Sequence, residues 1–378
     1  MTKVAPWRNS RFIKVVGQAF VLVIVISAIA FLGNNLVNNF QRLNLTFGYN
    51  FISRSASFGI ANAPISYSPT DSYLRAFLVG LLNSLRVMFF GIVFATIIGV
   101  TVGIGRLSNN WLVKKLAGIY VEVLRNTPLL LQLFFWYYAI FLKLPKIDNP
   151  LILGNVVFLT NRGLSLPWYE PNLRTGLALI AIVACILLAF ASWSERTSAI
   201  KRKESFISLA ISAIAMVGIT CFGIDWTFPQ LENQAIEGGL KLSPEFATLL
   251  IGLSIYTAAF IAEVVRGGIQ SVARGQWEAS QALGLKPSAI MRLIIFPQAL
   301  RVILPPLTSE FLNLAKNSSL AIAIGYSDLY AIASTISNQT GKSVEVLIII
   351  MIVYLAINLI ISASVNLFGF LFKLNRSF

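Results

Sequence analysis

The chain has 378 residues, of which 56% are hydrophobic and only 12% are charged, and its mean hydropathy is +0.75. Soluble globular domains carry about 25% charged residues, so this composition argues against a soluble domain and predicts an all-α integral membrane protein. The net charge is +15. The sequence contains no histidine, which excludes acid–base, nucleophilic and metal-binding chemistry that depends on an imidazole.

Apolar runs recur along the chain and are long enough to cross a bilayer as helices. We predict about eight transmembrane spans, at residues 15–33, 77–105, 117–140, 174–193, 206–223, 246–265, 302–325 and 346–372. The first run is longer than the core of a signal peptide, and no small-residue cleavage site follows Gly33, so we expect a retained anchor. Polar, turn-rich residues at 34–75 are expected to form an extracytoplasmic loop or short surface helices. A second such region, at 143–171, contains four prolines and is not expected to be helical throughout.

The basic residues gather on one side of the membrane in this topology. If the N-terminus is cytoplasmic, the inside segments carry 18 of the 30 basic residues and three acidic ones, whereas the outside segments hold nine of each. The positive-inside rule therefore places both termini in the cytoplasm. The net charge of +15 follows from this topology and does not indicate a nucleic-acid partner.

Charged and small residues inside the spans carry further information. The charged ones are Arg86, Glu122, Arg125, Glu263, Glu310 and Lys316. Charges at membrane depth cost several kcal/mol, so they tend to be paired or to face protein or water. Glu122 with Arg125, and Glu263 with Arg266, can each pair along one helix face, for which a structural role is favoured. The four-residue repeat of Ala95, Gly99 and Gly103 predicts close approach of another helix.

Residues 275–300 are unusually polar for a segment between two apolar spans. A short helix is predicted from Gln276 to Leu283, and Gly284 is placed to end it at the C′ position. Pro287 suits the first turn of a second helix that runs to the neighbourhood of Pro297. The charge pattern makes this hairpin cytoplasmic, either as a bare surface feature or as a contact for a partner protein.

The residues of this hairpin carry a resemblance to a known family. Glu278-Ala279-Ser280, then Gly284 after three residues, and Ile294-Ile295-Phe296-Pro297 after nine more resemble the EAA loop of ABC importer permeases, with Ser280 and Phe296 as mild departures. The stretches RNTPLL at 125–130 and TAAFIAE at 257–263 are similar to the polar amino-acid uptake branch. The added first span and two inserted spans resemble the larger permease subunits of broad-range L-amino-acid transporters.

The resemblance covers about 77–140 and 246–372 and implies a five-span permease core in the bacterial inner (plasma) membrane. It implies a non-enzymatic transport subunit whose loop, through Glu278, Ala279, Ser280, Gly284 and Pro297, docks on a cytoplasmic ABC ATPase. ATP and Mg would bind to that ATPase, and no cofactor would bind to this chain. Further implied partners are an extracytoplasmic amino-acid-binding protein and a second permease, homologous in a heterodimer, although the residues leave a homodimer open.

The implied division of the chain has four parts. They are an N-terminal span and extracytoplasmic loop (1–76), the first part of the core (77–140), extracytoplasmic loops with two inserted spans (141–245), and the second part of the core (246–378), with the coupling loop at about 275–300. The alternative function is a secondary amino-acid transporter or channel-like protein, which needs no ATPase. The coupling segment and the lack of an inverted repeat argue against it.

The seventh predicted span carries a polar stripe formed by Glu310, Asn313 and Asn317. The stripe is either a hydrogen-bonded cluster that holds the bundle together or a wall of the substrate path, where Glu310 would meet a substrate ammonium. Gln132, just past the Thr127-Pro128 break, is the expected facing residue, because the resemblance places that segment in the core. Lys316 lies beside the stripe and could pair with Glu310 or with a substrate carboxylate.

Overall fold

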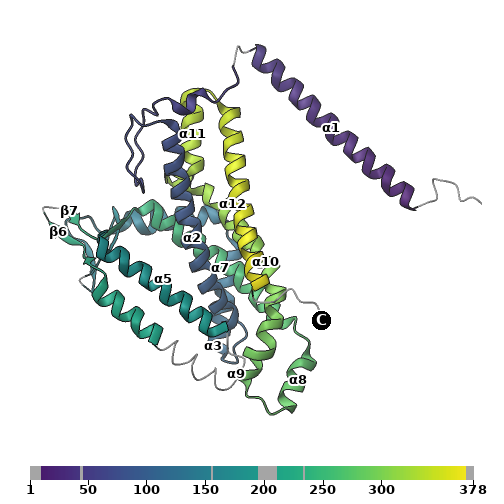
Figure 1. Ribbon diagram of the computed structural model, residues 1–378, viewed down its shortest axis with the longest axis vertical. Coiled ribbons are helices and arrows are strands. Elements are labelled where there is room, and N and C mark those ends of the chain that lie inside the picture. Colours follow the sequence, from purple (N-terminus) through teal and green to yellow (C-terminus); the bar gives the residue numbers. More distant parts are fainter. Residues whose placement is uncertain (1–9, 43–45, 155, 195–210, 233–234, 372–378) are drawn as a thin grey trace, which may run out of the picture.

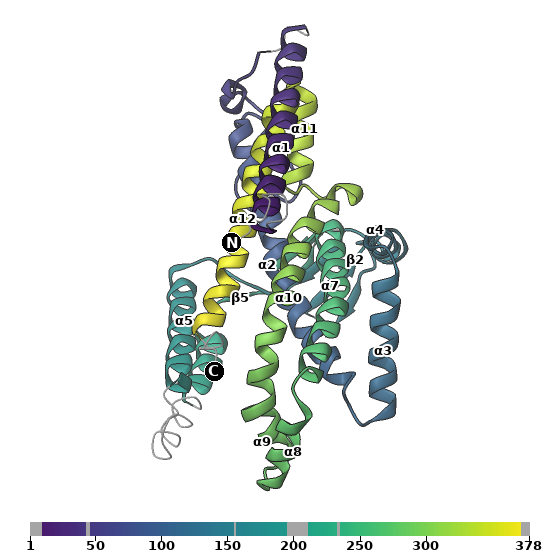
Figure 2. The ribbon, with the colours of Figure 1, turned by 90° about the vertical axis from the view of Figure 1, so that its right-hand side faces the viewer.

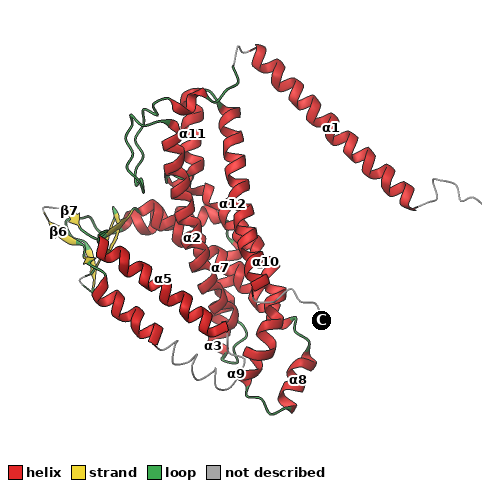
Figure 3. Ribbon diagram, in the orientation of Figure 1, coloured by secondary structure: helices red, strands yellow, loops and turns green. Residues whose placement is uncertain are grey.

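The structure is a computed structural model that describes residues 10–42, 46–154, 156–194, 211–232 and 235–371. Long helices dominate it, and short strands gather on one side (Figures 1 and 3). The longer helices are α1 (Ser10–Arg42), α2 (Tyr73–Gly105), α3 (Trp111–Asn126), α5 (Leu173–Ser194), α7 (Pro244–Gln270), α10 (Phe296–Asn317), α11 (Leu329–Thr340) and α12 (Ser343–Leu371). The shorter ones are α4 (Leu129–Phe134), α8 (Arg274–Ala282) and α9 (Pro287–Ile290).

Tighter and wider helical turns connect these elements. The 3₁₀ segments are η2 (Asn50–Ser53), η4 (Phe141–Lys143) and η7 (Ser318–Ile324), and the π segments are η3 (Phe135–Ile140), η5 (Ile219–Gly223) and η6 (Met291–Ile295). In the described residues, the helices long and apolar enough to cross a membrane are Lys14–Arg42, Tyr73–Gly105, Pro244–Gln270, Pro287–Ile324 and Ser343–Phe370. The predicted span at 206–223 lies partly outside the described residues.

The third predicted span, 117–140, is not one continuous helix. It divides into α3 and the run of α4, η3 and η4, and Thr127 between them has extended dihedral angles, φ −109° and ψ 135°. The ring of Pro128 disfavours helical dihedral angles in the residue before it, which is why α3 ends there. The chain changes direction at this point, and α4 lies across the upper end of α3 (Figure 2).

The opposite correction applies around the prolines of the seventh span. The helix that begins at Pro287 does not end near Pro297, because α9, η6 and α10 follow one another without a gap. Pro305 and Pro306 lie inside α10 and do not open a new helix. The two prolines have no amide hydrogen, so the carbonyls four residues earlier lose their usual helical donors, which membrane helices tolerate where other groups satisfy them.

The first helix also differs from expectation at its end. α1 continues through 34–42, where a loop or short surface helices were predicted. Pairs of asparagines alternate there with apolar residues, and low intrinsic helix propensity alone does not end a helix. α1 stands apart from the other helices, and its described side chains are exposed apart from half-buried Phe40 (Figure 1). The segment that follows α1 is fixed to the α11–α12 turn. Lys342 donates to the Thr46 carbonyl, and the Gly48 amide donates to the Glu345 carboxylate at 3.0 Å.

The all-α prediction is wrong for the inserted region, which contains short strands. A four-stranded antiparallel sheet runs in the order β1 (Leu151–Leu153), β2 (Val157–Thr160), β3 (Gly163–Leu166) and β8 (Leu240–Leu242). Two ribbons pair β4 (Trp168–Tyr169) with β5 (Trp226–Thr227), and β6 (Gln230–Glu232) with β7 (Ala235–Glu237). Strands of two to four residues are too short to give a periodic signal in the sequence, so they could not be distinguished from loops.

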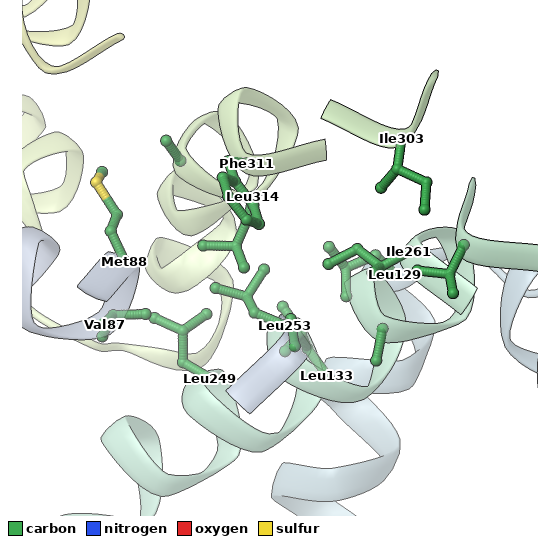
Figure 4. Packing of buried hydrophobic residues seen from close by; sticks show 14 of the residues in the cluster. Val87, Met88, Leu129, Leu133, Leu249, Leu253, Ile261, Ile303, Phe311 and Leu314 are labelled. Carbon is green, nitrogen blue, oxygen red and sulfur yellow. The ribbon is translucent and has the colours of Figure 1, made fainter. Parts of the chain in front are cut away.

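The core forms where α2 and α7 pack along each other, with α10 on another side of α7 and α12 against α10. The predicted small-residue repeat is confirmed. A Cβ atom at Gly99 would lie 2.6 Å from Ile261 Cβ, and one at Gly103 would lie 2.8 Å from the Ala262 carbonyl oxygen. Buried side chains from separate parts of the chain meet here, with Val87 of α2 beside Leu249 of α7 (Figure 4).

Candidate functional site

The first candidate site is the hairpin formed by α8 and α9, for which backbone geometry is decisive. The Leu285 amide donates to the Ser280 carbonyl at 3.3 Å, and the Gly284 amide donates to the Gln281 carbonyl at 2.9 Å. These two bonds form a Schellman motif, which needs a left-handed residue at C′. Gly284 has φ +70° and supplies it. Pro287 occupies the first turn of α9, so both predicted ends of the turn are confirmed.

The hairpin projects beyond the helical bundle and presents an exposed surface. α8 lies at the lower end of the molecule in both orientations (Figures 1 and 2). The Glu278 side chain is 66% exposed and forms an ion pair with Arg274 at 3.4 Å, and Leu283 at the turn is 77% exposed. Ala279 is exposed, whereas Ser280 is buried and its hydroxyl donates to the Gln276 carbonyl. One face of α8 is therefore held by the chain while the other is free for a partner.

Pro297 lies where the hairpin passes into the bundle. It stands in the first turn of α10, next to the buried side chain of Ile295. On α8, Trp277 packs against the core and lies on the same helix face as buried Ser280. Pro297 thus belongs to the continuous run of α9, η6 and α10, whereas Glu278, Ala279 and Ser280 lie on α8, which joins that run through the turn at Gly284.

The second candidate site is the polar stripe of α10. The buried face of this helix carries Phe311, Leu314 and Ala315. Asn313 is exposed, and Glu310 and Asn317 are half-buried, so the stripe points away from the core of this chain. The Asn313 amide donates a hydrogen bond to the Glu310 carboxylate. Glu310 and Asn313 are thereby brought together by helical spacing.

Residues of two other helices approach Glu310. The guanidinium carbon of Arg125, at the end of α3, lies 5.1 Å from the ring centroid of Phe260 on α7, which is a cation–π contact. The charge of Arg125 also acts on Glu310, and the charge of Glu310 acts on Tyr256 of α7, without an ion pair between Arg125 and Glu310 in the described residues. We name Arg125, Tyr256, Phe260, Glu310 and Asn313 the polar face.

Arg125, Tyr256 and Phe260 were not predicted as site residues. The expected ion pair between Glu122 and Arg125 is absent from the described part of the chain, because Arg125 turns toward Phe260 and Glu310. A signal existed in the spacing of Tyr256 and Phe260, which are four apart on α7, but its meaning depends on contacts that only the fold reveals.

The other predicted path residues have different surroundings. Gln132 is buried, and its amide nitrogen donates to the carbonyls of Leu124 at 3.0 Å and Thr127 at 3.1 Å, and to the Thr127 hydroxyl at 2.7 Å. It thus bridges the break between α3 and α4. Its amide oxygen has no hydrogen-bond partner among the described residues, and the side chain borders an apolar cavity of about 690 Å³.

Lys316 is also separated from Glu310. It borders a cavity of about 610 Å³ between α10, α11 and α12, together with Tyr330 and Asn358. The structure contains no ion pair between Lys316 and Glu310, both of which lie in the described region. Asn317 lies at the C-terminal end of α10, a full turn beyond Asn313.

One ionic cluster closes the lower end of the α2–α7 contact. Glu263 forms an ion pair with Arg266, as predicted, and a second one with Arg106, the C-cap residue of α2. The Arg106 contact was missed because it joins residues far apart in the sequence. Hydrogen bonds from Arg266 strengthen the cluster, which therefore fixes two helices and leaves none of its three charges without a partner.

Comparison with known proteins gives consistent matches. Residues 91–372 match the family described as "Binding-protein-dependent transport system inner membrane component". The chain is 44% identical over 364 residues to the general L-amino acid transport system permease protein AapQ of Rhizobium johnstonii, covering 93% of this chain and 90% of the relative. It is 42% identical over 363 residues to the putative amino-acid ABC transporter permease protein YhdX of Escherichia coli (strain K12), covering 93% and 92%.

A third relative is more distant but also matches over nearly its whole length. It is the glutamate/glutamine/aspartate/asparagine transport system permease protein BztB of Rhodobacter capsulatus, 36% identical over 406 aligned positions. The match covers 97% of this chain and 95% of that relative.

Proposed function

Because the chain belongs to the family of binding-protein-dependent transport system inner membrane components, we propose that it carries amino acids into the cytoplasm as a permease subunit of an ATP-driven importer. Such a component is not an enzyme, and the ATPase is a separate subunit. The observation that carries the substrate class is the similarity over more than 90% of the chain to permeases named for amino-acid transport.

The α8–α9 hairpin is proposed as the coupling element. Its exposed Glu278 and Ala279 would enter a groove of the cytoplasmic ATPase, which would hold ATP and Mg. Gly284 sets the angle between the two helices, and the continuity of α9, η6 and α10 through Pro297 supports direct transmission of ATPase movement into the bundle. Buried Ser280 would stabilise α8 itself, because its hydroxyl donates to the Gln276 carbonyl of the same helix.

The polar face is proposed as one half of the substrate path. Its charged groups point away from this chain's core, and charges at membrane depth need water or a partner. A second, homologous permease would complete the path, with Glu310 meeting the substrate ammonium and Arg125 its carboxylate. Asn313 and Asn317 would add amide contacts. Gln132 would act by holding the α3–α4 break, and Lys316 would lie beside the path, outside the Glu310 contact.

We also propose the eight-span topology, with both termini cytoplasmic and an extracytoplasmic binding protein as donor of substrate. Five long apolar helices and the shorter Leu129–Lys143 and Leu173–Ile182 support it. Cysteines introduced at Ser53 and Ser288 test the orientation, since Ser53 should react with an impermeant thiol reagent from outside and Ser288 should not. The reverse pattern would contradict this topology.

Reconstitution tests the function. The chain should co-purify with an ATPase and a homologous permease, and proteoliposomes of that complex should take up labelled L-amino acids only with ATP and a binding protein. A matched preparation with an inactive ATPase is the control. Uptake that persists in this control would instead support the secondary transporter.

A further inference from the structure

Arg86 is a charged residue within α2 that belongs neither to the coupling hairpin nor to the polar face. Its guanidinium carbon lies 5.2 Å from the ring centroid of Phe246, in the first turn of α7. Within the described ranges it forms no ion pair with an acidic residue. A charge on a membrane helix without an anionic partner faces water or a ligand in most proteins.

Arg86 borders a cavity of about 460 Å³. Parts of the chain that are distant in sequence form its wall, among them Ala63 of the loop before α2 and Tyr326 before α11. Trp168 and Tyr169 of β4 stack on one another at its edge, with ring centroids 5.0 Å apart. The inserted sheet therefore supplies one wall of a cavity whose floor belongs to the permease core.

The electrostatics of the cavity are one-sided. Lys241 of β8 is a second cation on the wall, and no acidic residue of the described chain lines it. Three carboxylates lie within two residues of lining residues in the sequence but do not line the cavity: Glu170, Glu245 and Asp328. Glu245 accepts a hydrogen bond from the Tyr137 hydroxyl at 2.9 Å, and one oxygen of Asp328 accepts one from the Ala331 amide at 2.8 Å. Both charged residues that line the cavity are cations, which favours an anionic ligand.

The wall chemistry defines the ligand further. A guanidinium matches the planar geometry of a carboxylate, and aromatic faces attract an ammonium group and cover apolar side chains. The volume lies in the range of small-molecule sites. A free amino acid combines a carboxylate, an ammonium and a small side chain, whereas a bare inorganic anion would leave the aromatic wall without a role.

We infer that this cavity binds the carboxylate end of a free amino acid on the extracytoplasmic side, as a site separate from the polar face. The choice of ligand rests on the proposed function. The two sites are distinct along α7, because Phe246 and Tyr256 are about 15 Å apart at the helical rise per residue. The site gives the strands of the inserted region a role in receiving substrate.

Cysteine protection tests this inference in the assembled complex. Ala63 is replaced by cysteine in a chain in which Cys185 and Cys221 are serine, and the complex with ATPase and second permease is placed in nanodiscs without ATP or binding protein. The rate of labelling by N-ethylmaleimide is measured against L-alanine and against L-alaninamide, which lacks the carboxylate. L-Alanine should slow the labelling and L-alaninamide should not.

Variants locate the effect. Arg86→Gln should raise the half-protecting concentration of L-alanine about tenfold or more, because a charge-assisted contact is lost. Arg162→Gln removes an exposed charge from the same inserted sheet and should leave protection unchanged. If Arg86→Gln does not assemble, Trp168→Ala in an assembled complex replaces it and should also weaken protection.

Several outcomes would overturn the inference. These are equal protection by L-alaninamide, no protection by L-alanine, an equal loss in Arg162→Gln, or protection that follows the phosphatidylglycerol content of the nanodisc, which would assign the cavity to a lipid headgroup. Failure of the proposed function is separable from these. It would appear as absent ATP-driven uptake while L-alanine still protects, whereas failure of the cavity site leaves uptake normal and protection absent.

Discussion

The coupling hairpin and the polar face achieve their geometry by different means. The hairpin is set by its own backbone, with two capping bonds around Gly284 and a proline at the start of α9, and most of its outer side chains are exposed. The polar face exists only because α3, α7 and α10 meet, and its charged groups balance one another across those helices. The hairpin should therefore be sensitive to backbone changes, and the polar face to single charges.

The largest expected effect is at Gly284. Gly284→Val places a β-branched residue at φ +70°, where L-residues lose about 1–2 kcal/mol or more, and the turn should open or shift. ATP-driven uptake should be lost while the protein still inserts in the membrane, as measured in proteoliposomes and by membrane fractionation. Gly284→Asn should retain part of the activity, since asparagine tolerates this conformation.

Gly275→Ala is the matched control for this position. Gly275 lies in α8, the helix that Gly284 ends, and it has no positive φ and open space around it, so uptake should be unchanged. Normal coupling in Gly284→Val would remove the basis for a backbone-determined hairpin.

The next effect concerns a single charge of the polar face. Glu310→Gln should lower uptake about tenfold or change the preference among amino acids, because a charge-assisted contact to the substrate ammonium is lost. Lys316→Gln removes a charge from the same helix, but Lys316 borders the cavity between α10, α11 and α12 and not the polar face. This variant should have little effect on uptake. Uptake of several labelled amino acids by both variants measures the difference, provided that complex assembly is normal.

The difference between the two sites also explains what the sequence could predict. Gly284 and Pro287 act on residues a few positions away, and the repeat of Ala95, Gly99 and Gly103 acts along one helix, so local spacing was sufficient. The stripe of Glu310 and Asn313 was likewise visible as a helical period.

The parts that were missed depend on distant segments. Arg125 finds its partners on α7 and α10, and β3 pairs with β8 across the inserted helices. A short separation in sequence wrongly favoured Glu122 as the partner of Arg125. The continuity of α10 through Pro305 and Pro306 depends on a packed membrane environment, which no residue pattern expresses.

A smaller effect, on stability, is expected at Gln132. Gln132→Ala removes the amide that donates to Leu124 and Thr127 at the α3–α4 break, leaving carbonyls unsatisfied. The expected destabilisation is about 1 kcal/mol, because hydrogen bonds within membrane proteins contribute modestly. A lower melting temperature with an unchanged amino-acid preference would fit a bridging role. An unchanged melting temperature with an altered preference would instead make Gln132 part of the path wall.

The smallest effect distinguishes two partners of Arg125. Arg125→Lys keeps the positive charge but loses the planar stacking on Phe260, so uptake should fall only a few-fold. Glu122→Gln should leave uptake unchanged, because Glu122 is not the partner of Arg125 in this fold. Combining Arg125→Lys with Glu310→Gln should cost less than the two single effects added together, since both residues act on one another. Strict additivity in that double variant, together with a loss of uptake in Glu122→Gln, would show that Arg125 interacts with Glu122 on α3 and is not coupled to Glu310. The residues of the polar face would then act independently.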